Sequence, residues 1–207
     1  MFFKHSKSRL EALSDGVFGF AATLMVVDLG SSSELISFAE ELPNFLSFGV
    51  SFFVMMALWK LHYNFFRRTK HVDDWIITFN MVLLFTVLFY IFPVKSLLDS
   101  MLQQKGMSLN ELAQLFQIYS IGFSTMFLSF VLMYYRAFKK DQKVDNPYVL
   151  LFYARHFSLF VLVGIISALM ASFKIGVQYG APGFVYVILG LLCYVHSVQF
   201  QKKHPFD

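Results

Sequence analysis

Residues 9–29, from Arg9 to Leu29, read RLEALSDGVFGFAATLMVVDL, and whether this stretch crosses a membrane decides the fold. Its uninterrupted apolar run, from Gly16 to Val27, is 12 residues long, whereas a helix needs about 20 residues to cross the hydrocarbon core of a bilayer. The hydropathy of this stretch alone leaves two possibilities, a helix that spans the membrane or one that lies at its surface. The rest of the chain resolves the choice.

The composition of the whole chain is that of an integral membrane protein. Of its 207 residues, 57% are hydrophobic, 27 are phenylalanine and only 14% are charged, and the mean hydropathy is +0.59. A soluble domain usually carries about 25% charged residues, so a soluble core of this length would leave too much apolar surface exposed. The same figures disfavour intrinsic disorder, a disulfide scaffold and a nucleic-acid-binding domain. The single cysteine, Cys193, is expected to be a buried and inert thiol.

Six apolar segments are long enough to be transmembrane helices, and we expect one all-α membrane domain over residues 1–207. Pro43 and Pro182 are expected in the first turns of the second and sixth helices, where a missing N–H is tolerated. Pro93 is expected to kink or end the third helix. The expected spans are residues 9–29, 44–66, 75–98, 112–136, 149–173 and 182–200.

Basic residues alternate between the connections. Lys and Arg are frequent at both ends of the chain and in the second-to-third and fourth-to-fifth connections. The basic residues of the intervening connections are only Lys105 and Lys174. By the positive-inside rule the basic connections and both termini are cytoplasmic, which requires an even number of spans. The segment 9–29 must therefore cross the membrane. The net charge of +4 reflects this topology and contact with anionic lipid, not a nucleic-acid partner.

No motif of enzyme or cofactor chemistry occurs in the sequence. There is no glycine-rich phosphate loop, no HExxH and no GxSxG, and no histidine has a second histidine or a carboxylate four residues away. A TVGYG-like carbonyl filter and an arginine-rich voltage sensor are also missing from the sequence. We therefore expect no enzymatic activity, no metal site and no cofactor.

Polar and ionisable residues gather in the segment 9–29, and such residues inside a membrane are candidates for a functional site. Arg9 is followed by three residues and then by Leu13, Ser14 and Asp15, with Thr23 further along. This pattern resembles the first helix of the transmembrane protein 175 family, the endolysosomal potassium channels and their bacterial relatives, which carries Arg, three residues and Phe-Ser-Asp. Leu13 replaces the usual Phe, and Phe20 stands where relatives commonly have Ile or Leu.

Two further stretches extend the resemblance along the chain. Residues 59–66, WKLHYNFF, are similar to the family's Trp-x-x-His-His-x-x-Phe at the end of the second helix. Asn80, followed by Leu83, Leu84, Phe85 and Pro93, resembles the third-helix pattern. The length and the six expected spans match the bacterial form with a single repeat.

The resemblance implies a potassium-permeable channel in the plasma membrane of a bacterium, with K⁺ as a permeant ion and not as a cofactor. It also implies a homotetramer in lipid, in which copies of the first helix surround a pore for monovalent cations. Helical geometry at 100° per residue allows this arrangement but does not require it, because lipid contact or core packing is the simpler explanation of an apolar stripe. The stripe consists of Leu13, Gly16, Phe20, Thr23, Leu24 and Val27, and a second stripe contains Asp15, Gly19, Ala22 and Val26.

By the same resemblance Phe20 forms the narrowest apolar constriction, with Leu24 and Val27 beyond it toward the outer mouth. Such a ring gates by dewetting and strips part of the hydration shell from an ion. Thr23 either offers its hydroxyl to a partly dehydrated ion or bonds back to the carbonyl four residues earlier. Phe18 lies about 160° from Phe20 around the helix, so we expect its truncation to change conduction little.

The inner end of the helix has a different expected role. Arg9, Ser14 and Asp15 are expected to hold this end in place, with partners among His62 and Asn80; the alternative is an Asp15 exposed to water at the membrane boundary. Four acids on the opposite side could concentrate cations at the outer mouth, or they could belong to an ordinary solvated loop. These acids are Asp28, Glu34, Glu40 and Glu41.

Two other function classes compete with the channel. A secondary transporter could use Asp15, His62 and Arg155 as coupling or substrate groups, although the sequence has no inverted repeat and no pair of broken helices. A membrane enzyme or assembly factor has no positive signal in the sequence. Passive ion flux would support the channel, and stoichiometric coupling to protons or a substrate would support the transporter.

Overall fold

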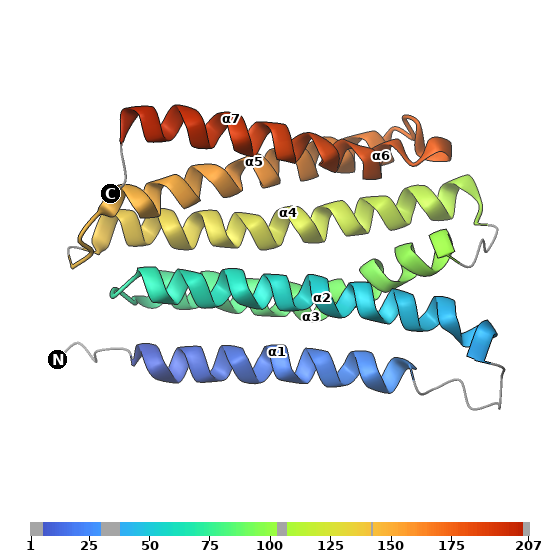
Figure 1. The fold of residues 1–207 in the computed structure, drawn as a ribbon, viewed down its shortest axis with the longest axis horizontal. Coiled ribbons are helices and arrows are strands. Elements are labelled where there is room, and N and C mark those ends of the chain that lie inside the picture. The colour runs from blue at the N-terminus through green and yellow to red at the C-terminus, as the bar shows by residue number, and fades with distance from the viewer. Residues whose placement is uncertain (1–5, 30–37, 103–106, 142, 205–207) are drawn as a thin grey trace.

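A computed structural model describes residues 6–29, 38–102, 107–141 and 143–204 of the chain, and helices account for nearly all of them (Figure 1). The last segment is broken into short elements before its final helix. The elements are α1 (Lys7–Leu29), α2 (Phe38–Arg68), α3 (Asp74–Leu102), α4 (Leu109–Lys140), α5 (Pro147–Ser172), η1 (Val177–Tyr179), α6 (Ala181–Phe184), η2 (Val185–Val187) and α7 (Ile188–Lys203).

Each of the expected spans is helical, and the prediction of an all-α membrane protein is confirmed. Five segments of the described chain are long and apolar enough to cross a membrane, and a shorter apolar stretch, Asp74–Tyr90, belongs to α3. The first segment is among the five, with Lys7–Val27 as its span. The chain is therefore a multi-pass membrane protein.

The three prolines behave differently from one another. Pro182 lies in the first turn of α6, as expected. The prediction for Pro43 is wrong, because α2 begins at Phe38 and Pro43 falls in its second turn; a proline there removes one helical hydrogen bond without preventing the turns on either side. α3 likewise continues through Pro93 to Leu102, so Pro93 does not end that helix.

The helices run side by side, with α1 at one edge of the molecule and α7 at the opposite edge (Figure 1). α1 packs against α2 and α3, α4 against α3 and α5, and α7 against α5. The start of α1 and the end of α7 lie at the same end of the bundle, where α2 meets α3 and α4 meets α5 (Figure 1). An even number of crossings places both termini at the same end. We call this end of the bundle the basic end, because its connections carry the excess of Lys and Arg.

Asp141, just after α4, ties the connections of the basic end together. Its carboxylate accepts the backbone N–H groups of Lys70 (2.6 Å) and His71 (3.0 Å) and the Thr69 hydroxyl (2.8 Å). Burial by itself raises the pKa of Asp141. The hydrogen bonds to its carboxylate lower the pKa by more than burial raises it, so that the net shift is downward. The Lys7 ammonium in α1 donates to the carbonyl of Thr69 across 3.0 Å, which links the start of α1 to the same structure.

Asp73 is a second carboxylate that joins elements at the basic end. Its Oδ1 accepts the backbone N–H of Ile76 at the start of α3, and its Oδ2 accepts Nε of Arg136 from α4 across 2.7 Å. Burial opposes ionisation of Asp73, whereas the Ile76 N–H and Arg136 favour it, and the pKa of Asp73 is lowered overall. The basic end is therefore held by two carboxylates in their charged forms.

Candidate functional site

A buried chain of hydrogen bonds joins the first three helices near the basic end. The Asn80 side-chain amide in α3 donates to Oγ of Ser14 in α1 across 3.0 Å, and Oδ1 of Asn80 lies 2.8 Å from Nε2 of His62 in α2. The Ser14 hydroxyl donates in turn to the carbonyl of Leu10 across 2.8 Å. All three side chains are buried. Because Oδ1 of Asn80 can only accept, Nε2 of His62 carries the proton in this arrangement.

Aromatic rings surround the histidine. The ring centroid of His62 lies 5.6 Å from that of Phe18 in α1 and 4.9 Å from that of Phe66 one turn along α2. Phe18 is only 2% exposed. The ring belongs to the core that seats α1, so its truncation would cost stability; the expectation that it changes conduction little stays a prediction.

Asp15 takes part in a different contact from the one expected. Its Oδ1 accepts the indole N–H of Trp59 in α2 across 2.8 Å, and the Trp59 ring stacks on Tyr63 with centroids 5.7 Å apart. The expectation that Asp15 pairs with His62 or Asn80 is wrong, because one residue along a helix is a rotation of 100°. That rotation turns Ser14 toward α3 and Asp15, which is exposed, toward Trp59.

Trp59 is the site residue that sequence reasoning missed as a partner of Asp15. The residue is part of the 59–66 motif, but a tryptophan near the end of a transmembrane helix is usually interpreted as an interfacial anchor. Nothing local to either residue indicates the pairing, since 44 positions separate them along the chain. Arg9 is exposed, and its guanidinium has no hydrogen-bond or ion-pair partner within the described ranges.

The side chains of α1 divide its surface into a buried face and an exposed face. Every third or fourth residue of α1 is buried against the core, and these residues form one face of the helix. The opposite face is open in the single chain. Phe20 is 57% exposed and Val27 is 70% exposed, Thr23 is also exposed, and Leu24 is half-buried. The buried face consists of Leu10, Ser14, Phe18, Ala21 and Met25.

The open face continues around the helix through Gly19 and Val26. Val26 is 54% exposed, and a methyl group placed on Gly16 or Gly19 would meet no atom within 4 Å. Packing inside one chain therefore does not require a small residue at either glycine. These positions allow another helix to approach α1 closely from outside the chain.

Thr23 bonds back to its own helix, although not to the carbonyl that we expected. Its hydroxyl donates to the carbonyl of Phe20, three residues earlier, across 2.7 Å. A hydroxyl that donates its only hydrogen bond to the backbone keeps its oxygen lone pairs available to accept a hydrogen bond or to coordinate a cation. The contact is therefore compatible with both of the roles considered for Thr23.

The remaining expected site residues lie elsewhere or outside the described side chains. Arg155 is exposed on α5, with its guanidinium 5.7 Å from the ring centroid of Phe200 in α7, and it takes no part in the hydrogen bonds around Ser14. The described residues contain no group of three or more His, Cys, Asp or Glu side chains that could hold a metal ion. The four expected outer acids, Asp28, Glu34, Glu40 and Glu41, have side chains outside the described set.

Comparison with known structures supports the arrangement of the helices. The chain superposes on the potassium channel MtTMEM175, crystallised as a variant with a nanobody–MBP fusion protein, with a TM-score of 0.77 and 23% identity over 96% of this chain and 94% of that one. A lysosomal potassium-selective channel TMEM175 homolog from Chamaesiphon minutus gives a TM-score of 0.63 at 18% identity, over 94% of this chain and 97% of that one. At these identities the likeness concerns the fold.

Sequence comparisons point to the same group of proteins. A potassium channel of Marivirga tractuosa is 28% identical over 158 residues, which are 69% of this chain and 64% of the relative. A potassium channel of a Chryseobacterium species is 38% identical over 82 residues, or 39% of this chain and 43% of that one. The matched part of the chain thus spans less than two thirds of the length of these two relatives.

The fold and the buried contacts of its first three helices define a multi-pass helical membrane protein organised around α1. Residues 9–93, which contain most of α1, all of α2 and most of α3, match the model of the family described as endosomal/lysosomal potassium channel TMEM175. This match covers less than half of the 207 residues.

Proposed function

We propose that the protein is a potassium-permeable cation channel, and that copies of α1 from a homotetramer line its pore. The match of residues 9–93 to the family model and the similarity to potassium channels of other bacteria support this proposal. A single helix cannot enclose a pathway for ions, so a pore built on α1 requires several subunits. The site for such an assembly is the bacterial plasma membrane, with lipid around the outer helices.

The observation that carries the proposal is the open apolar face of α1. Phe20, Val27 and Leu13 are each more than half exposed in the single chain, while the other side of the helix is buried against α2 and α3. Lipid would also cover such a face, but lipid contact does not explain why α1 carries Thr23 and two unobstructed glycines there. A face that meets the same face of other subunits accounts for both features.

The proposed pore selects ions without a filter of carbonyl groups. Rings of Phe20, Leu24 and Val27 form an apolar passage from which water withdraws, so that an ion must give up part of its hydration shell to pass. Potassium holds its shell less strongly than sodium, which favours its passage. Thr23 lies within this passage, and its oxygen, whose proton is donated to the Phe20 carbonyl, can stabilise the partly dehydrated ion.

Two contacts of the inner end, one buried and one exposed, would fix the rotation of α1. Ser14 is held by Asn80 of α3, and the neighbouring Asp15 is held by Trp59 of α2. Two contacts that leave the helix about 100° apart restrain rotation about its axis better than one contact can. The constriction residues are then turned away from α2 and α3 and toward the proposed pore.

The outer acids have an electrostatic part in the proposal. Asp28, Glu34, Glu40 and Glu41 add negative charge to a connection without basic residues. In a tetramer such charges attract cations to the outer mouth, over a range of about 8 Å at physiological salt.

Liposome reconstitution tests the proposed activity. The purified chain is placed in liposomes with a potassium gradient, and we expect passive flux that stops at the Nernst potential for K⁺. Flux that requires a fixed ratio of protons or of another solute would overturn the proposal in favour of a secondary transporter. Protein-free liposomes and liposomes with heat-inactivated protein give the background.

A further inference from the structure

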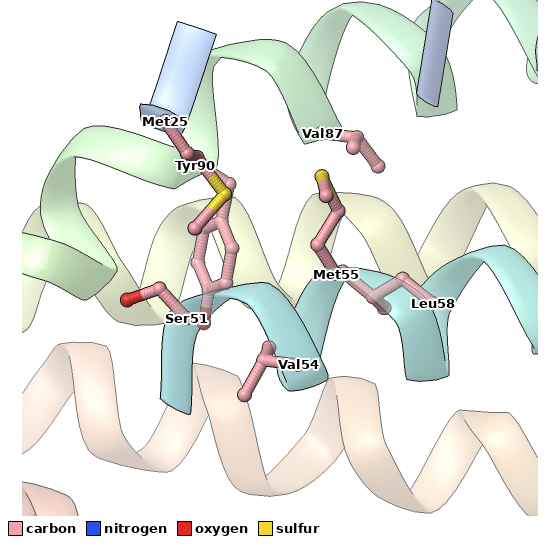
Figure 2. Close-up of a pocket in the computed structure, with 7 residues that line it drawn as sticks. All are labelled: Met25, Ser51, Val54, Met55, Leu58, Val87 and Tyr90. Carbon is pink, nitrogen blue, oxygen red and sulfur yellow. The ribbon is translucent and has the colours of Figure 1, made fainter. Parts of the chain in front are cut away.

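A small cavity lies between α1, α2 and α3, in the half of the bundle away from the basic end. Its volume is about 10 Å³, and Figure 2 shows the residues around it, with the Tyr90 ring pointing from α3 toward α2 at the level of Ser51. Apart from Ser51 and Tyr90 its walls are apolar. The lining residues are Met25 of α1, Ser51, Val54, Met55 and Leu58 of α2, and Val87 and Tyr90 of α3.

Two hydroxyl groups at this cavity are buried and unpaired. Ser51 and Tyr90 are each 4% exposed, and the Ser51 hydroxyl has no hydrogen-bond partner among the described residues. Ser47, one turn earlier on α2, is in the same situation. The Tyr90 hydroxyl makes no hydrogen bond of good geometry among these residues, although Tyr119 of α4 is a polar neighbour, with the two ring centroids 5.2 Å apart. An unpaired hydroxyl in apolar surroundings costs free energy, and in folded proteins such groups are nearly always satisfied by protein or by bound water.

The lack of a partner at Ser51 is unusual within this protein. Most serines and threonines of these helices donate to a carbonyl of their own helix. Thr86 of α3 donates to Val82 across 2.7 Å, and Ser129 of α4 donates to Thr125 across 2.9 Å. Ser51 does not make this contact, so its hydroxyl remains available to the cavity.

We propose that the cavity binds one water molecule, which bridges the hydroxyl of Ser51 in α2 and the hydroxyl of Tyr90 in α3. A cavity needs about 10–15 Å³ to hold a water molecule, which must also find two or more polar partners. The volume and the two hydroxyls meet both conditions. The apolar walls of Met55 and Val87 and the small volume exclude a larger ligand.

The position of this water relates it to α1. Met25, which closes the cavity on one side, belongs to the buried face of α1, opposite the open face that contains Phe20 and Val27. The water thus lies behind the outer half of α1 and links the two helices on which α1 rests. The proposal concerns folding contacts inside one chain and stands whether or not α1 lines a pore.

A double-mutant cycle tests the bridge. Ser51→Ala, Tyr90→Phe and the double variant are made in the full chain, and their thermal unfolding is followed in the same detergent. Each single variant removes one of the two partners of the water, which is then held by a single hydrogen bond or lost, so we expect each to lower the Tm by about 2–4 °C. The double variant removes both hydroxyls, and its Tm should be no lower than that of either single variant.

Ser129→Ala is the matched control. Ser129 is as buried as Ser51, but its hydroxyl already bonds to its own helix, so its effect should add to that of Tyr90→Phe without coupling. If Ser51→Ala and Tyr90→Phe each raise or preserve the Tm and combine additively, the cavity is dry and the proposal is overturned. A crystal structure at about 1.5–2 Å with density within hydrogen-bond distance of both hydroxyls would support the bridge directly, and an empty cavity at that resolution would overturn it.

Discussion

The side-chain amide of Asn80 in α3 donates to the hydroxyl of Ser14 in α1 across 3.0 Å. Only one residue further along α1, Asp15 turns to Trp59 of α2 instead. Ser14 and Asp15 therefore hold α1 to both of its neighbours, Ser14 to α3 and Asp15 to α2. The residues that hold α1 and the residues on its open face occupy different sides of one helix, which allows mutations to separate their effects.

Truncation of the proposed constriction should increase ion flux. Phe20→Ala removes the bulkiest apolar group from the open face of α1, which lets water into the passage and lowers the barrier from dewetting. We expect higher cation flux and weaker discrimination of K⁺ from Na⁺ in planar-bilayer recordings.

The control for this experiment is Val26→Ala, because Val26 is exposed on α1 but outside the stripe of Phe20. Phe18→Ala is unsuitable, since loss of this buried ring should cost about 3–5 kcal/mol of stability. A larger change in conduction for Val26→Ala than for Phe20→Ala would show that the pore face is assigned wrongly.

Loss of the Asn80 amide should weaken the fold. Asn80→Ala leaves the N–H of His62 buried without an acceptor, and we expect a loss of about 1–3 kcal/mol in the free energy of unfolding. Thermal unfolding in detergent measures the effect, with Thr78→Ala on the exposed side of α3 as the control. An Asn80→Ala protein as stable as the wild type would mean that this contact does not hold α1.

Asp15 should matter less for stability than a fully buried carboxylate would. Because Asp15 is exposed and accepts one hydrogen bond from Trp59, we expect Asp15→Ala to cost about 1 kcal/mol. Trp59→Phe, which removes the donor and keeps most of the ring, should give a similar loss. Thermal unfolding of both variants and of the double variant measures their coupling, and strictly additive losses would argue against the contact.

Stability at the basic end should depend on Asp141 above its pKa and not below it. The pKa of Asp141 is lowered in the folded state, so its contribution is fully present above the ordinary value of 3.8 and is lost as the pH falls through the folded value. Asp141→Asn should therefore be less stable than the wild type at pH 7, by about 1–3 kcal/mol. The gap in Tm should close as the pH is lowered below about 4; a gap of constant size would contradict the assignment.

The oligomeric state can be measured without reference to conduction. If α1 lines a pore, the purified protein should behave as a tetramer of 24.0 kDa chains in native mass spectrometry from a mild detergent. Detection of the monomer alone, under conditions that preserve known membrane oligomers, would remove the basis for a pore built from α1.

The sequence by itself determined the properties that depend on local composition. Apolar runs bounded by polar residues predict the helices because hydrocarbon accepts only segments whose backbone is paired internally. Alternation of basic connections predicts an even number of crossings, which identifies residues 9–29 as a span despite their short apolar run. The spacing of residues along α1 also separates the stripe of Phe20 from the other faces, since this follows from 100° per residue.

Only the tertiary structure decided which residues meet. Arg9, Ser14 and Asp15 were all expected to find partners among His62 and Asn80, but only Ser14 meets Asn80. Asp15 meets Trp59 instead, because the rotation of α1 against its neighbours is set by packing. The burial of Phe18 against His62 has the same origin. Ser51 and Tyr90 line one cavity although they lie on different helices, far apart along the chain. Periodicity specifies which face of a helix is apolar, whereas the partner of each face depends on contacts between segments far apart in the chain.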